Sequence, residues 1–297
     1  MKILLTGSTG QLGNEIIKAC PRFINKNKVK LITPKKEEFD LTKPEICIKK
    51  IEEIKPDWVI NSAAYTAVDK AESEFELALS INMNGPQIIS DVISKNGGKL
   101  LHFSTDFVFS GKSSTPYKPT DEKSPINAYG LTKAKGEDQI IRKLFDTDQA
   151  IILRTSWLMG PVGNNFAKTM IRLHKERDII NVVSDQIGSP TSTINLAKAC
   201  WEIIKKDSLN SLKSNILHFS DSGIASWYDV AIQIGKIGFK KSLLKKQAKV
   251  FPIPSNQYPV PARRPNFSVL DCFSTMHQFD LEFHYWVEAL DAVIERF

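Results

Sequence analysis

The chain has 297 residues, a formal net charge of +7 and 42% hydrophobic residues, which is enough apolar material for one large domain or two unequal ones. No run approaches the roughly 18 apolar residues of a membrane span, and the first apolar stretch is too short for a signal peptide. The four cysteines show no metal-ligand spacing. The lysine-rich run Lys236–Lys249 is interpreted as solvated surface. We therefore expect a cytoplasmic globular protein with no membrane or nucleic-acid partner.

The first half of the chain alternates short apolar runs with helical patterns, at the spacing of βαβ units. The expected strands are Lys2–Thr6, Val29–Thr33, Trp58–Asn61, Lys99–Ser104 and Ala150–Arg154. The expected helices are Asn14–Cys20, Glu45–Ile54, Glu74–Lys95 with an interruption near Gly85-Pro86, and Ala128–Leu144. The pattern predicts an α/β fold with a Rossmann-like, doubly wound parallel sheet. His102 and His218, both in expected strands, are interpreted as packed residues.

After residue 155 the elements become shorter and less regular. We expect helices over Asn165–Glu176 and Ala225–Ile237, strands over Asp178–Val183 and Asn215–Phe219, and an ordered, proline-rich surface loop over Phe251–Pro265. We predict an NAD(P)-binding Rossmann domain over residues 1–156, with returning segments near 178–205. Residues 157–297 are expected to form mainly a smaller C-terminal substrate-binding domain.

A glycine-rich turn, Gly7-Ser-Thr-Gly10-Gln-Leu-Gly13, directly follows the first expected strand. Strand, glycine turn and helix are the setting of a dinucleotide fingerprint, in which backbone N–H groups approach a pyrophosphate at a helix N-terminus. Three such glycines can also form a plain tight turn. The position immediately after a strand favours nucleotide binding.

The end of the second expected strand bears on the choice of nicotinamide cofactor. An NAD site usually places an acidic residue there, for the ribose 2′-hydroxyl. This chain has Lys35 and Lys36 at that point, and Glu37 and Glu38 follow slightly late. Because lysines suit a 2′-phosphate, we expect NADPH, with NADH also accepted.

Tyr129 and Lys133 lie four residues apart on an expected helix, so their side chains share one face. A free tyrosine phenol is a weak acid with a pKa near ~10, and an adjacent ammonium would lower that pKa. Thr105, at the end of an expected strand, adds a hydroxyl. Together the three predict a proton-delivery site, although a solvated tyrosine–lysine pair would leave the same pattern.

Several motifs in order resemble the extended short-chain dehydrogenases and, more narrowly, the dTDP-4-dehydrorhamnose reductase family. They are Thr6–Gly13, Asn61–Glu72, Ser104–Phe109, Tyr129–Lys133, Leu153–Trp157, Asp185–Thr191 and Arg263–Pro265. The resemblance implies reduction of the C4 ketone of dTDP-4-dehydro-L-rhamnose to dTDP-L-rhamnose by NADPH. In that reaction Tyr129 would be the general acid. Lys133 would lower the pKa of the phenol and bond the nicotinamide ribose, and Thr105 would hydrogen-bond the carbonyl and the phenol.

The same resemblance assigns further residues to the two ligands. Cofactor contacts are expected at Gly7, Gly10, Gln11, Leu12, Asp40, Leu41, Ala63, Ala64, Tyr65, Asn82, Tyr129 and Lys133. Substrate contacts are expected at Thr66, Val68, Asp69, Thr105, Trp157, Arg263 and Arg264. Plain structural roles stay open for the two alanines, Asn82 and Trp157. One arginine of the pair is expected to point inward, because a guanidinium binds phosphate oxygens in bidentate fashion.

Some members of this family bind magnesium through glutamates, often at a dimer contact, and Glu15 matches one such position. Ser192–Asn195 offers no carboxylate where those members carry one, so we predict no metal site of that type. Glu15 is interpreted instead as a favourable charge in the first turn of a helix. A homodimer is left open. Two other functions also stay open: a non-catalytic regulatory subunit on the same fold, similar to that of methionine adenosyltransferase, and a reductase of another nucleotide sugar.

Overall fold

The computed structural model describes residues 1–206 and 215–297. Its centre is one parallel sheet of six strands, in the order β12-β7-β6-β5-β1-β4. The strands are β1 (Lys2–Thr6), β4 (Lys30–Ile32), β5 (Trp58–Asn61), β6 (Lys99–Thr105), β7 (Ala150–Thr155) and β12 (Ile216–His218). After β1 the chain pairs first on one side, through β4, and then on the other, through β5. Such a switch opens a crevice at the carboxyl ends of the strands.

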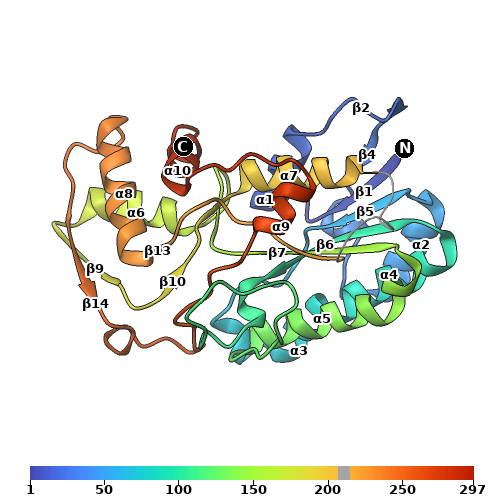
Figure 1. Ribbon diagram of the computed structural model, residues 1–297, viewed down its shortest axis with the longest axis horizontal. Helices are drawn as coiled ribbons and strands as arrows, with labels where there is room; N and C mark the ends of the chain where they lie inside the picture. The colour runs from blue at the N-terminus through green and yellow to red at the C-terminus, as the bar shows by residue number, and fades with distance from the viewer. Residues whose placement is uncertain (207–214) are drawn as a thin grey trace.

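Helices cover both faces of this sheet (Figure 1). One face packs against α1 (Gln11–Lys18) and α7 (Thr193–Lys205), and the other against α2 (Pro44–Ile54), α4 (Gly85–Asn96) and α5 (Ala128–Leu144). Successive residues of β1 explain why, since Ile3 and Leu5 join the first apolar cluster whereas Leu4 joins the second. The predicted doubly wound, Rossmann-like fold is confirmed.

A smaller lobe lies to the left in Figure 1. There α6 (Phe166–Glu176), α8 (Trp227–Lys240) and α10 (Trp286–Ile294) share a separate apolar cluster with the parallel pair β9 (Ile179–Val183) and β14 (Lys249–Ile253). The later part of the chain also returns to the main sheet through α7 and β12. The division into domains at residues 156 and 157 stays a prediction.

Short elements connect these units. The paired short strands are β2 (Phe23–Ile24) with β3 (Asn27–Lys28), β8 (Leu158–Met159) with β11 (Thr191–Ser192), and β10 (Ile187–Gly188) with β13 (Ala225–Ser226). The remaining helical segments are α3 (Phe75–Leu79), α9 (Phe273–Gln278), η1 (Lys36–Glu38), η2 (Lys70–Glu72), η3 (Ser80–Asn84), η4 (Asp106–Val108), η5 (Phe145–Thr147) and η7 (Ser255–Gln257). Within the described residues, no helix is both long and apolar enough to cross a membrane.

Several expected bounds differ from the structure by a few residues, and one expected loop is wrong in part. The proline-rich segment is a strand at its beginning, because residues through Ile253 belong to β14. Pro252 is tolerated there since β14 belongs to a two-stranded sheet, where each strand has a free edge that needs no N–H. The long helix is interrupted before Gly85, by a π-helical turn over Ser80–Asn84, and Pro86 lies in the first turn of α4, where its missing N–H costs little.

Candidate active site

A cleft of about 530 Å³ lies where the strands end, and Thr6, Ser62, Ser104 and Thr155 line it at the ends of or just after β1, β5, β6 and β7. Its volume is typical of a cofactor site. The structure places most of the expected cofactor residues in its wall, namely Gly7, Gly10, Gln11, Leu12, Asp40, Leu41, Ala63, Ala64, Tyr129 and Lys133. The expected substrate residue Thr66 also lines it. The expected residues outside this wall are Tyr65, Val68, Asp69, Asn82, Thr105, Trp157, Arg263 and Arg264.

The glycine turn packs too closely for side chains at two of its positions. Gly7 has a φ of +68°, and a Cβ there would lie 2.7 Å from the backbone nitrogen of Ala63. A Cβ on Gly13 would lie 2.2 Å from the carbonyl oxygen of Gly7. Gly10 caps α1 without a side-chain hydrogen bond. The first N–H groups of α1 therefore border the cleft, as an anionic pyrophosphate requires.

Two lysines border the same cleft beyond β4. Lys35 and Lys36 line it, together with Pro34. Glu38 does not line the cleft, and its Oε2 accepts a hydrogen bond from the backbone N–H of Lys35 at 2.9 Å. The arrangement offers positive charge to a 2′-phosphate, and it supports the predicted preference for NADPH.

Tyr129 is held where the start of α5 meets the turn after β6. Asn127 caps the helix, and its side-chain oxygen accepts the N–H of Gly130 at 2.7 Å. A Cβ on Gly130 would lie 2.1 Å from the carbonyl oxygen of Phe107, so only glycine allows this close approach. The rings of Phe107 and Tyr129 meet edge to face, with centroids 5.8 Å apart. The phenol is thereby brought to Thr105, which precedes η4.

The pKa of Tyr129 is raised and not lowered as expected, and Lys133 is not among the causes of the shift. Burial, and to a smaller extent the charge of Asp106, raise the pKa of Tyr129 to about 12, although a hydrogen bond with Thr105 lowers it. Lys133 points inward instead, and its Nζ lies 2.6 Å from the carbonyl oxygen of Phe103 and 3.2 Å from Nε2 of His102. The phenol therefore stays protonated at neutral pH, as a proton donor must.

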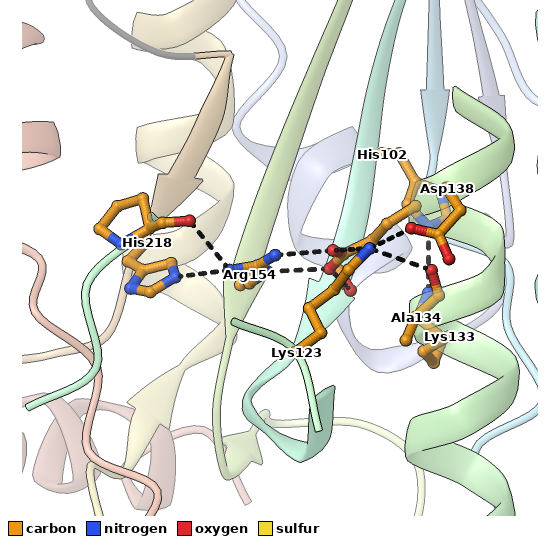
Figure 2. Close-up of polar contacts among 10 residues, drawn as sticks. His102, Lys123, Lys133, Ala134, Asp138, Arg154 and His218 are labelled. Atoms are coloured by element: carbon orange, nitrogen blue, oxygen red, sulfur yellow. Dashed lines mark hydrogen bonds and ion pairs between the residues drawn. The ribbon is translucent and has the colours of Figure 1, made fainter. Parts of the chain in front are cut away.

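Lys133 is only 2% exposed, and burial lowers its pKa to about 8, while the charge of Glu137 opposes that change. Glu137 in turn is fully buried and belongs to an ionic cluster with Arg154 and Lys123, two residues that Figure 2 shows between β7 and α5. Its Oε1 accepts from Nε of Arg154 at 2.9 Å and from Oγ of Ser104 at 2.5 Å, and its Oε2 accepts from Nη2 of Arg154 at 2.7 Å. Lys123 adds a contact at 3.4 Å. The cluster fixes α5 against β6 and β7.

Sequence reasoning correctly interpreted His102 as a packed residue but assigned no role at the site to the polar residues beneath it. His102, Glu137 and Arg154 are each no more than 1% exposed, and the first two reach Lys133 by contact and by charge respectively. Asp106 was missed too, although it directly follows Thr105. It is 2% exposed, and burial raises its pKa to about 7. Their position in the sequence could have indicated a role, because these residues lie on or next to the expected strands and helix that carry the predicted site residues.

Asn82 and Tyr65 bond to each other rather than to the cleft. The Asn82 amide accepts from the backbone N–H of Tyr65 at 2.9 Å and donates to its carbonyl at 3.1 Å and to the Thr132 hydroxyl at 3.1 Å. The phenol of Tyr65 donates to Glu74 at 2.6 Å, which raises the pKa of Tyr65 to about 12. Asn82 thus shapes the segment after β5 through its own hydrogen bonds.

On the expected substrate side, the two arginines differ. Arg264 holds Asp69 through two contacts, 3.1 Å from Nη1 to Oδ1 and 2.8 Å from Nη2 to Oδ2, whereas Arg263 is exposed. Trp157 stacks on Trp227 with ring centroids 3.6 Å apart and planes 5° apart. Of the two arginines, Arg264 is the less exposed, and which of them meets the substrate stays a prediction.

The interpretation of Glu15 as a charge in the first turn of α1 is wrong, because that turn holds no acidic residue. Glu15 is 3% exposed and accepts from both Nη atoms of Arg296, at 2.7 and 2.9 Å. A guanidinium thus neutralises this carboxylate. The described residues contain no group of three or more His, Cys, Asp or Glu side chains placed to hold a metal ion.

Comparison with known proteins decides the family. The family model of the RmlD substrate binding domain matches residues 1–297. The dTDP-4-dehydrorhamnose reductase of Aggregatibacter actinomycetemcomitans is 37% identical over 290 residues, which is 97% of each chain. This chain belongs to the dTDP-4-dehydrorhamnose reductase family. The Salmonella typhimurium member is 36% identical over 288 residues, covering 96% of this chain and 94% of its own.

Solved structures of the dTDP-4-dehydrorhamnose reductase family have the same architecture. The Clostridium acetobutylicum protein has a TM-score of 0.89 and 38% identity over 99% of both chains. The Bacillus anthracis protein, solved in complex with NADP, has a TM-score of 0.86 and 32% identity, with 100% of this chain and 99% of its own covered. These likenesses confirm the recognition of the family from its motifs.

Proposed function

We propose that the protein reduces the C4 ketone of dTDP-4-dehydro-L-rhamnose to dTDP-L-rhamnose, with NADPH as the hydride donor. The observation that carries the proposal is the position of Tyr129: a protonated phenol, with the buried Lys133 one helical turn away, in the wall of a cleft that opens on the glycine turn. The NADP bound by the Bacillus anthracis relative supports the choice of cofactor.

The residues present suit a nicotinamide dinucleotide. The N–H groups at the start of α1 would hold the pyrophosphate, and Lys35 and Lys36 would face the 2′-phosphate. When bound, the nicotinamide supplies a hydride to the carbonyl carbon. The chain itself has to place that carbonyl and deliver one proton to its oxygen.

Tyr129 would deliver that proton. As negative charge develops on the carbonyl oxygen, the phenol gives its proton to it and becomes a phenolate. Thr105 orients the phenol by their hydrogen bond. The Lys133 ammonium, one turn along α5, would bond the nicotinamide ribose and so fix the ring beside the carbonyl carbon. Arg264 would bind the diphosphate, exchanging its contacts with Asp69 for phosphate oxygens.

The assay mixes purified protein with NADPH and dTDP-4-dehydro-L-rhamnose and follows absorbance at 340 nm. We expect a substrate-dependent loss of absorbance. No loss, with NADPH binding intact, would favour the regulatory alternative. Turnover of a different nucleotide sugar in its place would keep the reductase and change the substrate.

The Tyr129→Phe variant tests the proton donor. We expect turnover to fall by about 10²–10⁴-fold, because the general acid is lost while the ring stays in place. NADPH binding, measured by fluorescence titration, should persist. Turnover close to that of the wild type would remove Tyr129 from this role.

Two further proposals concern the cellular compartment and the oligomeric state. A nucleotide-sugar reductase is expected in the cytoplasm, where NADPH is supplied. A homodimer is also proposed, and light scattering on the purified protein measures it directly; a single-chain mass of 33.4 kDa would rule it out.

A further inference from the structure

A chain of four buried polar side chains runs beneath the cleft, from the glycine turn to the active-site lysine. The Thr6 hydroxyl lies 2.7 Å from Oδ1 of Asn61, and Nδ2 of Asn61 lies 3.0 Å from Nδ1 of His102. Nε2 of His102 lies 3.2 Å from Nζ of Lys133. All four side chains are at most 2% exposed, so their hydrogen bonds must be satisfied within the chain.

The donors and acceptors of this chain fit together in only two ways. Burial, and next the charge of Lys133, hold the pKa of His102 well below its usual range, so the imidazole is neutral and carries one N–H. If Nδ1 accepts from the Asn61 amide, the proton is on Nε2, and Lys133 must be a neutral amine that accepts it. If Lys133 is an ammonium, it donates to a bare Nε2, and the proton is on Nδ1.

The second arrangement requires Asn61 to present its oxygen to Nδ1. An asparagine amide exchanges donor and acceptor when it turns by about 180°, and a threonine hydroxyl both donates and accepts. Thr6 and Asn61 can therefore follow the change, and every hydrogen bond of the chain reverses. Thr6 also accepts the backbone N–H of Ala63, at 3.3 Å, so the chain ends on the backbone that lines the cleft.

We propose that His102 is a positioning residue for Lys133 and works as a tautomer switch. It accepts a hydrogen bond through Nε2 when Lys133 is charged and donates one through Nε2 when Lys133 is neutral. In passing from the charged to the neutral state, the Lys133 ammonium loses one proton to the cleft that it lines, and the single imidazole proton of His102 moves from Nδ1 to Nε2. The net loss is one proton, and the imidazole is neutral in both states.

The groups around Lys133 bring the loss of its proton close to physiological pH. The ionisable groups that act on Lys133 are His102 of β6, by contact, and Glu137 of α5, by charge, and behind Glu137 lie Arg154 of β7 and Lys123. Tyr129 lies one turn before Lys133 on α5, and Asp106 of η4 acts on Tyr129. Burial lowers the pKa of Lys133 to about 8 and Glu137 opposes it, so both states are within reach near neutral pH. By accepting from the ammonium, His102 favours the charged state, which the proposed reaction uses.

The switch itself is tested without substrate. In protein labelled with ¹⁵N-histidine, long-range ¹H–¹⁵N NMR spectra report which ring nitrogen carries the proton. Signals that disappear in His102→Gln belong to His102. We expect Nδ1–H at pH 6 and Nε2–H at pH 10, with the change near pH 8. The Lys133→Met variant should abolish the change. One unchanged tautomer from pH 6 to 10 in the wild type, or a change that persists in Lys133→Met, overturns the proposal.

The catalytic consequence rests on the proposed function and has its own readout. In His102→Leu the ammonium loses an acceptor, so the basic limb of the kcat profile should move down by about one pH unit or more. His102→Gln keeps an amide at this position and should restore the limb. A limb that stays in place in His102→Leu, with an unchanged Tm, contradicts the positioning role. If the wild type reduces no sugar, the proposed function is wrong, but the NMR experiment still tests the tautomer switch because it needs no substrate.

Discussion

Two buried carboxyl groups act on the proposed site, Asp106 on Tyr129 and Glu137 on Lys133, and their pKa values are shifted in opposite directions. Glu137 is 0% exposed and Asp106 is 2% exposed, so burial penalises the charge on both. Burial raises the pKa of Asp106 to about 7. Burial also opposes ionisation of Glu137, but Arg154, Lys123 and Ser104 outweigh it, and its pKa is lowered. The two carboxyl groups are buried to a similar degree, so their different pKa values come from their different partners.

The difference separates two tasks around one site. Glu137 has a guanidinium on both of its oxygens. Asp106 has a hydroxyl contact from Thr105 on Oδ1, and its Oδ2 has no hydrogen-bond partner in the part of the chain that the structure describes. The first group is a permanent charge that supports Lys133. The second is a carboxyl that gains or loses its proton near neutral pH, and it lies beside Tyr129 and Thr105.

The largest effect is expected when Glu137 loses its guanidinium and is made to resemble Asp106. Arg154→Met would leave Glu137 with Lys123 as its remaining salt-bridge partner among the described residues, and removing one partner of a buried ion pair costs about 3–5 kcal/mol. The free energy of unfolding from urea denaturation at pH 7 measures it. The matched control is the double variant Arg154→Met, Glu137→Met, which should recover most of the loss. A double variant as unstable as the single one would contradict this account.

A smaller effect is expected when Asp106 loses its ability to titrate. Its folded pKa is above the unfolded value, so the native state holds more protons between about pH 4 and 7 and stability falls as pH rises through that window. Asp106→Asn should remove about 2–4 kcal/mol of this decline. The test is the difference in unfolding free energy between variant and wild type at pH 4.5, 6 and 7.5. Parallel curves would show that Asp106 does not titrate in this range.

The smallest change in stability is expected at a third carboxyl, which has an arginine but is not deeply buried. Asp69 and Arg264 have side chains 38% and 24% exposed, and the hydrogen bond with Arg264 lowers the pKa of Asp69. Arg264→Met should cost no more than about 1 kcal/mol of stability. It should nevertheless raise the KM for the nucleotide sugar about 10-fold or more, because a charged hydrogen bond to phosphate is lost.

The neighbouring arginine provides the matched control for that test. Arg263 is exposed and its side chain is not part of the Asp69 pair, so Arg263→Met should leave KM within about 2-fold, as expected for a screened surface charge. Equal effects of the two substitutions would mean that general positive charge, and not the geometry of Arg264, attracts the substrate.

The sequence was sufficient to predict the sheet, the glycine turn and α5, because these depend on local signals. Alternating apolar residues, three spaced glycines and the helical spacing of Tyr129 and Lys133 are all visible within short windows. The bounds of α5 were predicted to the residue. The π-helical turn at Ser80–Asn84 and the strand at Pro252 were not predicted, because tertiary packing outweighed the local pattern there.

The ionisation of the site could not be predicted in the same way. The direction of the Tyr129 pKa depends on how deeply the phenol is buried and on where the Lys133 ammonium points, and the carbonyl of Phe103 and the ring of His102 decide the latter. The partners Glu137 and Arg154 lie 17 positions apart on different elements. Distances of that kind arise only when β6, β7 and α5 are assembled.

The ion pair between Glu15 and Arg296 has a consequence for synthesis of the chain. The carboxylate belongs to the helix that begins at the glycine turn, but its guanidinium is made 281 residues later. Until Arg296 is made, the salt-bridge partner of Glu15 is Lys18 of the same helix, at 3.0 Å, and that half-exposed lysine offsets only part of the cost of burying the carboxylate. We expect the dinucleotide half to remain only partly consolidated, and open to chaperones, until the last turn of the protein has emerged.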